Sequence, residues 1–243
     1  MRDFFTGSEL TELNSVLREF HEAWLRENAE AYSRHAINSA YITGGKHLSR
    51  ERRSVIFQFI GRQKIDDIVS SIIPRRSSFI NTQLFFDPAD VGQKNYWHRD
   101  IQYADLSIEA QAAVFDASEV LHLRVPLAKE RGIELVPGSH RRWDSKEELE
   151  VRMERAGRKR YDDLSTAAQI PLRRGDLLVF SANMIHRGLY GGGRFAFDIC
   201  VADEKADVFK YVSEDCLPDE QDLKKLECPQ LFLNTIELMR AAS

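Results

Sequence analysis

Residues 194–201 constrain the fold more than any other segment, because their hydrophobicity changes with a period of two. Large apolar residues alternate there with charged or small ones: Phe195, Phe197, Ile199 and Val201 against Arg194, Ala196, Asp198 and Cys200. Successive side chains on a β-strand point to opposite faces, so this pattern predicts a strand with one face in the hydrophobic core.

Further strands are expected in the same part of the chain, at residues 79–86, 120–127, 134–136 and 177–180. They are rich in β-branched and aromatic residues and are bounded by turn residues such as Asp87-Pro88 and Pro137-Gly138. The charged stretch from Asp144 to about Ala168 interrupts this pattern and is interpreted as a helical insertion, with a lid over a site as one role open to it.

Helices are expected before the strands. Leu10, Leu13, Leu17, Phe20 and Trp24 fall on one helical face, and Thr6-Gly7-Ser8-Glu9 fits a capping box at the start of that helix. Two more helices are expected at residues 49–60 and 63–73, the latter ending before Pro74.

These patterns predict a single domain that is mainly β with flanking helices, an α+β protein built on a cupin-like jelly roll. Residues 1–76 form the helical flank, 77–203 the jelly-roll core with the insertion at about 144–168, and 204–243 a C-terminal extension with a helix.

Composition narrows the classes of function. The 243 residues carry a net charge of −4, which does not favour a nucleic-acid partner, and no apolar run is long enough for a membrane span. The N-terminus lacks the apolar core of a signal peptide. The 3 cysteines have no metal-type spacing, and one stays unpaired in any disulfide scheme, so we expect a cytoplasmic protein.

The tetrapeptide Trp97-His98-Arg99-Asp100 is the strongest candidate for chemistry. His98 and Asp100 share one face if the segment is a strand or its end, and His186 lies downstream in a similar segment. Two histidines and one carboxylate form the facial triad of non-haem Fe(II) oxygenases, which leaves coordination positions open. A His-x-Asp pair alone also fits an ordinary strand end at the surface.

Three segments together make the chain resemble the phytanoyl-CoA dioxygenase-like family of Fe(II)- and 2-oxoglutarate-dependent oxygenases. The first is Trp97-His98-Arg99-Asp100, and the second is Arg131-Gly132-Ile133-Glu134-Leu135-Val136-Pro137-Gly138-Ser139-His140. The third runs from Gly175-Asp176 through His186-Arg187 to Arg194. The order of the segments along the chain is the specific part of this resemblance.

The resemblance implies a double-stranded β-helix with Fe(II) held by His98, Asp100 and His186, the catalytic residues. It implies 2-oxoglutarate as co-substrate with O₂, and Arg194 as the partner of its remote carboxylate. Arginine suits that task because its planar fork stays protonated when buried. Arg187 is the rival, but it adjoins a ligand on a strand and is expected to point away.

Other residues are assigned with alternatives. Asn81 and Gln83 share a strand face and either contact 2-oxoglutarate or substrate, or form a polar rim. Arg124 lies in an apolar strand and either meets an anionic substrate or pairs with an acid such as Asp198. His122, on the same face as Arg124, is expected to be a core histidine with satisfied hydrogen bonds.

The sequence departs from the family's usual pattern at two positions near the expected metal ligands. Arg99 stands where the family usually has glutamine, which makes it a candidate substrate contact. Gly188 stands where a hydroxyl residue is frequent.

We therefore expect a dioxygenase that hydroxylates a small molecule and releases succinate and CO₂. Related halogenases replace the carboxylate at position 100, so its presence favours hydroxylation. Arg99, Arg124, Arg141 and Arg142 hint at an anionic substrate. Two alternatives stay open: a jelly-roll protein that binds metal without oxygenase turnover, and a cupin-type metal-dependent isomerase or hydrolase.

Overall fold

The computed structural model describes residues 1–205 and 209–242, which form two antiparallel sheets flanked by helices. The five-stranded major sheet has the order β1–β2–β8–β3–β6, and the three-stranded minor sheet has the order β5–β4–β7. The strands are β1 (Asn38–Ala40), β2 (Ser77–Phe86), β3 (Val120–Pro126), β4 (Glu130–Leu135), β5 (Ala168–Leu172), β6 (Leu178–Ser181), β7 (His186–Gly188) and β8 (Phe195–Asp203). The two sheets with their helical flank confirm the predicted α+β jelly roll.

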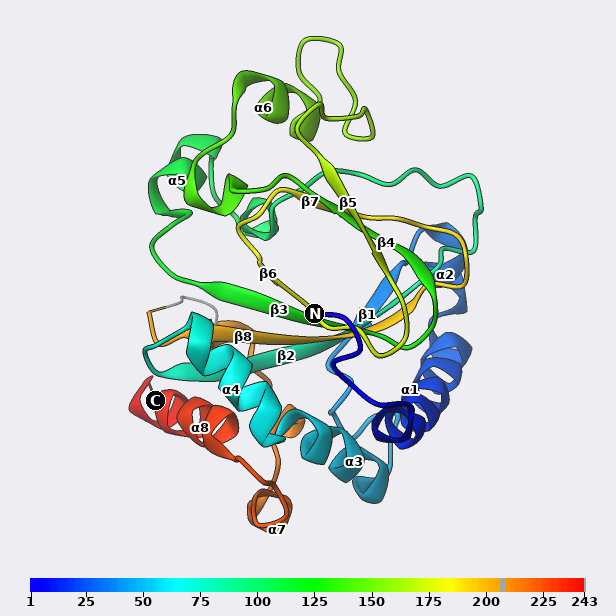
Figure 1. Ribbon diagram of the computed structural model, residues 1–243, viewed down its shortest axis with the longest axis vertical. Coiled ribbons are helices and arrows are strands. Elements are labelled where there is room, and N and C mark those ends of the chain that lie inside the picture. Colours follow the sequence, from blue (N-terminus) through cyan, green and yellow to red (C-terminus); the bar gives the residue numbers. More distant parts are fainter. Residues whose placement is uncertain (206–208, 243) are drawn as a thin grey trace.

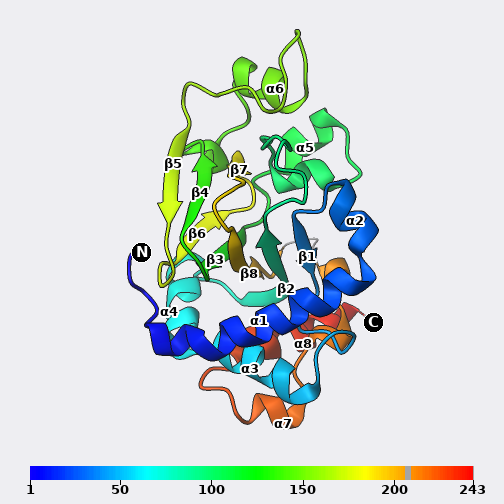
Figure 2. The same cartoon turned by 90° about the vertical axis from the view of Figure 1, so that its right-hand side faces the viewer.

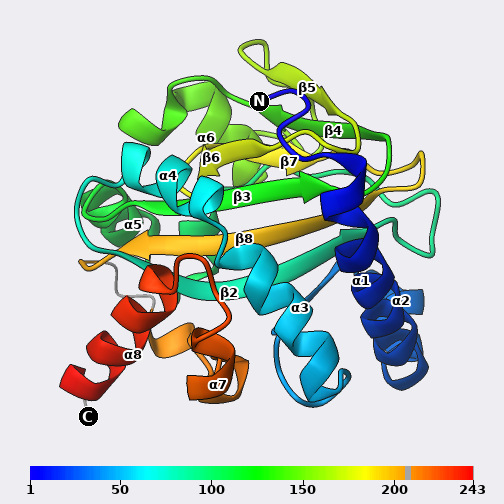
Figure 3. The ribbon, with the colours of Figure 1, turned by 60° about the horizontal axis from the view of Figure 1, so that its bottom comes forward.

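The helices lie mainly on one side of the major sheet. They are α1 (Gly7–Glu27), α2 (Ala29–Arg34), α3 (Arg50–Ile60), α4 (Gln63–Ile72), α5 (Ile108–Val114), α6 (Lys146–Arg152), α7 (Glu220–Leu223) and α8 (Gln230–Ala242). Figure 1 shows α1, α3, α4 and α8 on one side of β2, β8 and β3, with β4, β5 and β7 on the other. In Figure 3, α1, α3 and α4 cross in front of these three long strands. Figure 2 shows α5 and α6 at the opposite end of the molecule from α7.

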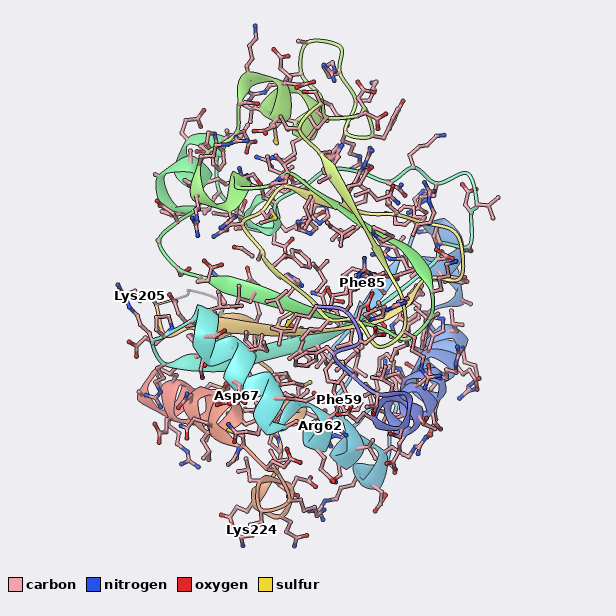
Figure 4. The ribbon with its side chains drawn as sticks, viewed as in Figure 1. Phe59, Arg62, Asp67, Phe85, Lys205 and Lys224 are labelled. Atoms are coloured by element: carbon pink, nitrogen blue, oxygen red, sulfur yellow. The ribbon has the colours of Figure 1, made fainter. Side chains whose placement is uncertain are left out.

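The predicted alternation in β8 separates the two faces of the major sheet. Phe197 and Ile199 are fully buried in a core cluster that includes residues of α1, α3 and α4. Asp198 lies on the opposite face, which looks toward the minor sheet, and there it pairs in register with Arg124 of β3. Figure 4 labels Phe59 among the helices and Phe85 on the side of the minor sheet. The sheet therefore turns an apolar face to the helices and a more polar face to the interior.

The predicted N-terminal helices form as expected. The Thr6 hydroxyl accepts a hydrogen bond from the backbone N–H of Glu9, and the Glu9 carboxylate accepts one from the backbone N–H of Thr6. This capping box satisfies two N–H groups that the start of a helix leaves unpaired. Ser49 caps α3 in a similar way through the backbone N–H of Arg52.

The insertion between Asp144 and Ala168 differs from the prediction. Only α6 is helical, and the residues that follow it form turns before β5 begins at Ala168. Glu154, Ala156 and Gly157 all have positive φ angles, a left-handed conformation that no continuous α-helix contains. The charged composition of this stretch therefore reflects exposed turns more than a helix face.

The C-terminal extension packs on the major sheet through α8. The Asn234 side chain donates a hydrogen bond to the carbonyl of Ser77, and the Thr235 hydroxyl donates one to the carbonyl of Phe79. Both acceptors belong to β2, so the last helix is fixed to the strand that opens the jelly roll. Among the described residues, no helix combines the length and apolarity that crossing a bilayer requires.

Candidate metal centre

The two predicted ligand segments lie side by side. The backbone N–H of His98 donates to the carbonyl of His186 over 3.0 Å, and the N–H of His186 donates to the carbonyl of His98 over 2.9 Å. This isolated antiparallel bridge places the first segment against β7. The chain then turns into a short 3₁₀ helix at Asp100, whose N–H donates to the carbonyl of Ala182. His98 is therefore at the end of a strand-like segment, as predicted.

The side chains of His98, Asp100 and His186 converge on one point. Asp100 Oδ1 lies 3.7 Å from His98 Nε2 and 3.6 Å from His186 Nε2. One candidate ligand atom from each residue lies within 4.8 Å of the other two, and the imidazole centroids are 4.1 Å apart. Two imidazole nitrogens and one carboxylate oxygen are the donor set of a facial non-haem iron site.

Each ligand imidazole is oriented by a backbone carbonyl. Nδ1 of His98 lies 3.3 Å from the carbonyl of Tyr96, and Nδ1 of His186 lies 2.8 Å from that of Met184. With Nδ1–H as donor, each Nε2 lone pair is free to face the centre. Burial, reinforced by the neighbouring His186, lowers the pKa of His98 to about 3, and burial also lowers the pKa of His186. Both rings are therefore neutral near pH 7, the form that binds metal.

The second oxygen of Asp100 is held by His122. His122 Nε2 donates to Asp100 Oδ2 over 2.8 Å, and the His122 ring stacks on Phe180 with centroids 5.1 Å apart. Burial alone raises the pKa of Asp100, but the hydrogen-bonded His122 and the other imidazoles outweigh it and hold this pKa well below its ordinary value. Asp100 is therefore a carboxylate whose Oδ1 is left for a metal ion.

The contacts of His122 continue into a buried ion-pair network. His122 Nδ1 lies 3.5 Å from Oδ2 of Asp198. The other carboxylate oxygen of Asp198, Oδ1, lies 3.2 Å from Arg124 Nη1. Arg124 also donates to both carboxylate oxygens of Glu130. Arg124 therefore forms the ion pair with Asp198, one of the two roles considered for it. Glu130 and Asp198 together compensate its buried charge, so a substrate is not needed to do so.

Arg194 is different from the other buried arginines. Among the residues that the structure describes, five arginines are buried: Arg99, Arg124, Arg152, Arg187 and Arg194. The first four each form an ion pair, whereas Arg194 has none among the described residues, and its Nε and Nη1 atoms have no hydrogen-bond partner. Burial, followed by the charge of Arg124, lowers the pKa of Arg194 to about 10, so it stays protonated at neutral pH.

Arg187 points away from the centre, as predicted. It forms an ion pair with Glu134 and another with Asp163 at 2.6 Å, and its guanidinium stacks on the Trp97 ring at 4.5 Å. These contacts tie the long insertion to the ligand segment. In the part of the chain that the structure describes, Arg194 is then the buried arginine that has no ion pair and can receive a ligand.

Arg99 has its partners within the protein, and its contact with substrate stays a prediction. Arg99 is fully buried and donates to Asp144 over 2.7 Å and to the carbonyls of Ser139 and Arg142. Its neighbours His98 and Asp100 turn to the centre, so its own side chain is directed to the other face of the segment. Arg99 thereby fastens the Pro-Gly-Ser-His turn to the ligand segment.

Asn81 and Gln83 make local contacts in the structure. Asn81 follows a register shift in β2, and its Oδ1 accepts from the backbone N–H groups of Tyr41 and Thr82. Gln83 Oε1 accepts from Asn38 over 3.4 Å, and Gln83 pairs in register with Asp198. Contacts of either residue with 2-oxoglutarate stay a prediction.

Sequence reasoning missed the tyrosines beside His98. The rings of Tyr96 and Tyr103 lie 5.3 Å and 5.6 Å from the His98 ring, and their hydroxyls are 3.4 Å apart. Arg160 of the insertion stacks on Tyr96, and its carbonyl accepts from the N–H of Trp97. Tyr96, two residues before His98, was visible in the sequence, whereas the approach of Arg160 depends on the fold.

Comparison with known proteins places this geometry in a family. The profile of the phytanoyl-CoA dioxygenase (PhyH) family matches residues 1–189. A comparison with curated protein sequences gave no match.

Several solved structures share the fold at low identity. EctD from S. alaskensis with 2-oxoglutarate and 5-hydroxyectoine is 16% identical, with a TM-score of 0.59 over 84% of this chain and 71% of that one. The non-haem α-ketoglutarate-dependent carbocyclase SnoK from nogalamycin biosynthesis is 16% identical, with a TM-score of 0.52 over 82% and 77%. The nickel complex of the non-haem monooxygenase ThoJ is 16% identical, with a TM-score of 0.54 over 97% and 90%.

Proposed function

This chain belongs to the phytanoyl-CoA dioxygenase family of Fe(II)- and 2-oxoglutarate-dependent oxygenases, and we propose that it hydroxylates a small molecule with succinate and CO₂ as co-products. One observation carries the proposal. A cluster of His98, Asp100 and His186 shares the interior of a jelly roll with Arg194, a buried cation that has no ion-pair partner within residues 1–205 and 209–242. A dicarboxylate co-substrate that chelates a metal ion needs both the metal ligands and a cation for its remote carboxylate.

His98, Asp100 and His186 fit Fe(II) by their donor set. The two neutral imidazoles and one carboxylate leave a ferrous ion with residual positive charge and open positions for a chelating 2-oxo acid and O₂. Bound iron supplies the oxidative chemistry with O₂, while the protein supplies ligation, orientation and the exclusion of water. Because Asp100 occupies the carboxylate position, hydroxylation is favoured over halogenation.

Arg194 fits the remote carboxylate of 2-oxoglutarate. Its guanidinium lies over the rings of Phe85 and Tyr190, at 4.9 Å and 5.5 Å from their centroids, so apolar surface surrounds it. A carboxylate beside this guanidinium accepts hydrogen bonds from it and neutralises a buried charge. Gly188 adjoins this guanidinium and follows His186 by two residues on β7, so Arg194 lies on the face of the strand to which the ligand imidazole points.

The substrate is proposed to approach through a groove of about 770 Å³ along β6 and the 116–119 loop. Its lining includes Phe180 and Met184, and the Phe180 ring lies 5.0 Å from the His186 ring. This volume is in the range of small-molecule sites. Of the four arginines behind the expectation of an anionic substrate, Arg99, Arg124 and Arg142 have acidic partners within the protein, whereas Arg141 lines this groove.

Two alternative functions differ from the proposed one, because neither of them requires Arg194. A jelly-roll protein that binds metal without turnover, or a cupin-type isomerase or hydrolase, has no need for a buried, unpaired arginine. The reaction is tested with a panel of small molecules, O₂, Fe(II) and 2-oxoglutarate, following succinate together with the mass of the product. Succinate formation coupled to a product heavier by one oxygen atom supports hydroxylation, whereas 2-oxoglutarate left unconsumed with every candidate contradicts it.

A further inference from the structure

Gly188 lies where a side chain would collide with Arg194. A Cβ atom built on Gly188 lies 2.3 Å from Nη2 of Arg194, 2.8 Å from Cζ and 3.2 Å from Nη1. Cβ atoms in folded proteins essentially never lie within 3.0 Å of an atom of a distant residue, so one of the two must shift. The guanidinium therefore occupies the space that any other residue at position 188 fills with its side chain.

The backbone does not require glycine at this position. Gly188 is absent from the glycines with positive φ, whereas Gly191, Gly192 and Gly193 in the next loop all have positive φ angles. An alanine at position 188 therefore meets no backbone strain of its own. What the glycine provides is room for Arg194.

The start of β8 limits how Arg194 can respond to a side chain at position 188. The Asp87 carboxylate accepts hydrogen bonds from the backbone N–H groups of Gly191, Gly193 and Arg194, which fixes the loop before the strand. The guanidinium itself is bounded by Phe85 and Tyr190. A Cβ at position 188 therefore moves the guanidinium off its present position rather than the strand.

We propose that Gly188 is a positioning residue for Arg194. By leaving room for the guanidinium, Gly188 sets the distance from the metal centre at which Arg194 receives a distal carboxylate. This inference rests on the proposed function, because it assumes that Arg194 binds the remote carboxylate of 2-oxoglutarate. It makes the pair Gly188 and Arg194 one recognition element. The element discriminates 2-oxo acids with a second carboxylate from those without one.

The experiment measures dissociation constants by anaerobic calorimetry on Fe(II)-loaded protein. The proteins are the wild type, Gly188→Ala, Arg194→Gln and the double variant, with Gly7→Ala as control, since a Cβ at Gly7 meets no atom within 4 Å. The ligands are 2-oxoglutarate and pyruvate, a 2-oxo acid without a second carboxylate. Fe(II) affinity is measured separately by competition with a chelator.

Gly188→Ala is expected to weaken 2-oxoglutarate binding by about tenfold or more, because a charge-assisted hydrogen-bond pair is lost. Pyruvate binding and Fe(II) affinity are expected to stay unchanged. In the double variant, Gly188→Ala adds nothing to Arg194→Gln, since the two act through one contact. If Gly188→Ala lowers the melting temperature, the shorter glutamine of the double variant is expected to restore it.

Wild-type affinity for 2-oxoglutarate in Gly188→Ala overturns the inference, as do equal losses for pyruvate and 2-oxoglutarate. Fully additive losses in the double variant also overturn it. In each of these results the wild type still binds 2-oxoglutarate, so the proposed function stands. Failure of the wild type to bind 2-oxoglutarate defeats the proposed function itself and this inference with it.

Discussion

His122 and Asp100 form a hydrogen bond of 2.8 Å that leaves one carboxylate oxygen of Asp100 for the metal centre. The bond uses Oδ2, while Oδ1 faces the imidazoles of His98 and His186. Burial lowers the pKa of His122, but Cys200, Asp100 and Asp198 outweigh it and raise this pKa well above its ordinary value. A charged His122 donates from both ring nitrogens and connects Asp100 to the buried ion pairs behind it.

Replacing His122 by leucine is expected to weaken Fe(II) binding by about 10- to 100-fold, as for other groups that orient metal ligands. The leucine removes the donor to Asp100 and keeps apolar contact with Phe180. Fe(II) affinity is measured by competition with a chromogenic chelator, with the exposed His35→Leu as control. Equal affinities of His122→Leu and the wild type contradict the orienting role.

Arg124 and Arg194 are predicted to respond to the same substitution in opposite ways. Arg124→Met leaves the buried Glu130 without its cation and removes one of the two cations beside Asp198, and it is expected to lower the free energy of unfolding by about 3–5 kcal/mol. Arg194→Met removes an unpaired buried charge and is expected to leave this free energy unchanged or higher. Urea denaturation of the metal-free proteins measures both. A loss in Arg194→Met as large as in Arg124→Met argues against an unpaired cation.

Glu9 is predicted to contribute to stability in a pH-dependent way. Burial raises the pKa of Glu9, but hydrogen bonds from Lys64 and Thr6 outweigh it and lower this pKa from 4.5 to about 2. Because the folded-state pKa is the lower one, the contribution is present above about pH 4.5 and is lost as the pH falls toward 2. Glu9→Gln is therefore expected to be less stable than the wild type at pH 7 and equally stable near pH 2. A stability difference that does not change with pH excludes this linkage.

The sequence predicts the parts of this fold that local patterns determine. The alternation around Asp198 predicts β8 and its two faces, and the capping box at Thr6 predicts the start of α1. The spacing of His98 and Asp100 predicts that both side chains reach one point, which the structure confirms.

Contacts between distant segments explain what the sequence does not predict. Arg99 donates a hydrogen bond to Asp144 and His122 donates one to Asp100, and no local sequence pattern predicts either partner. Arg99 is a candidate substrate contact in the sequence because it replaces the glutamine that is usual in the family, although alternation along the segment directs it to the face opposite the ligands. Arg194 shows the converse, because its importance lies in the partner it lacks, and that absence is visible only in three dimensions.

The central claim is that one site holds Fe(II) and 2-oxoglutarate together, and the visible absorption spectrum of the anaerobic protein tests it most directly. Adding Fe(II) and then 2-oxoglutarate to the wild type is expected to produce a charge-transfer band that saturates. Asp100→Ala is expected to abolish the band through lost Fe(II) affinity, and Arg194→Met to require about tenfold or more 2-oxoglutarate. Absence of the band in the wild type, with both variants binding Fe(II) and 2-oxoglutarate as the wild type does, contradicts the claim.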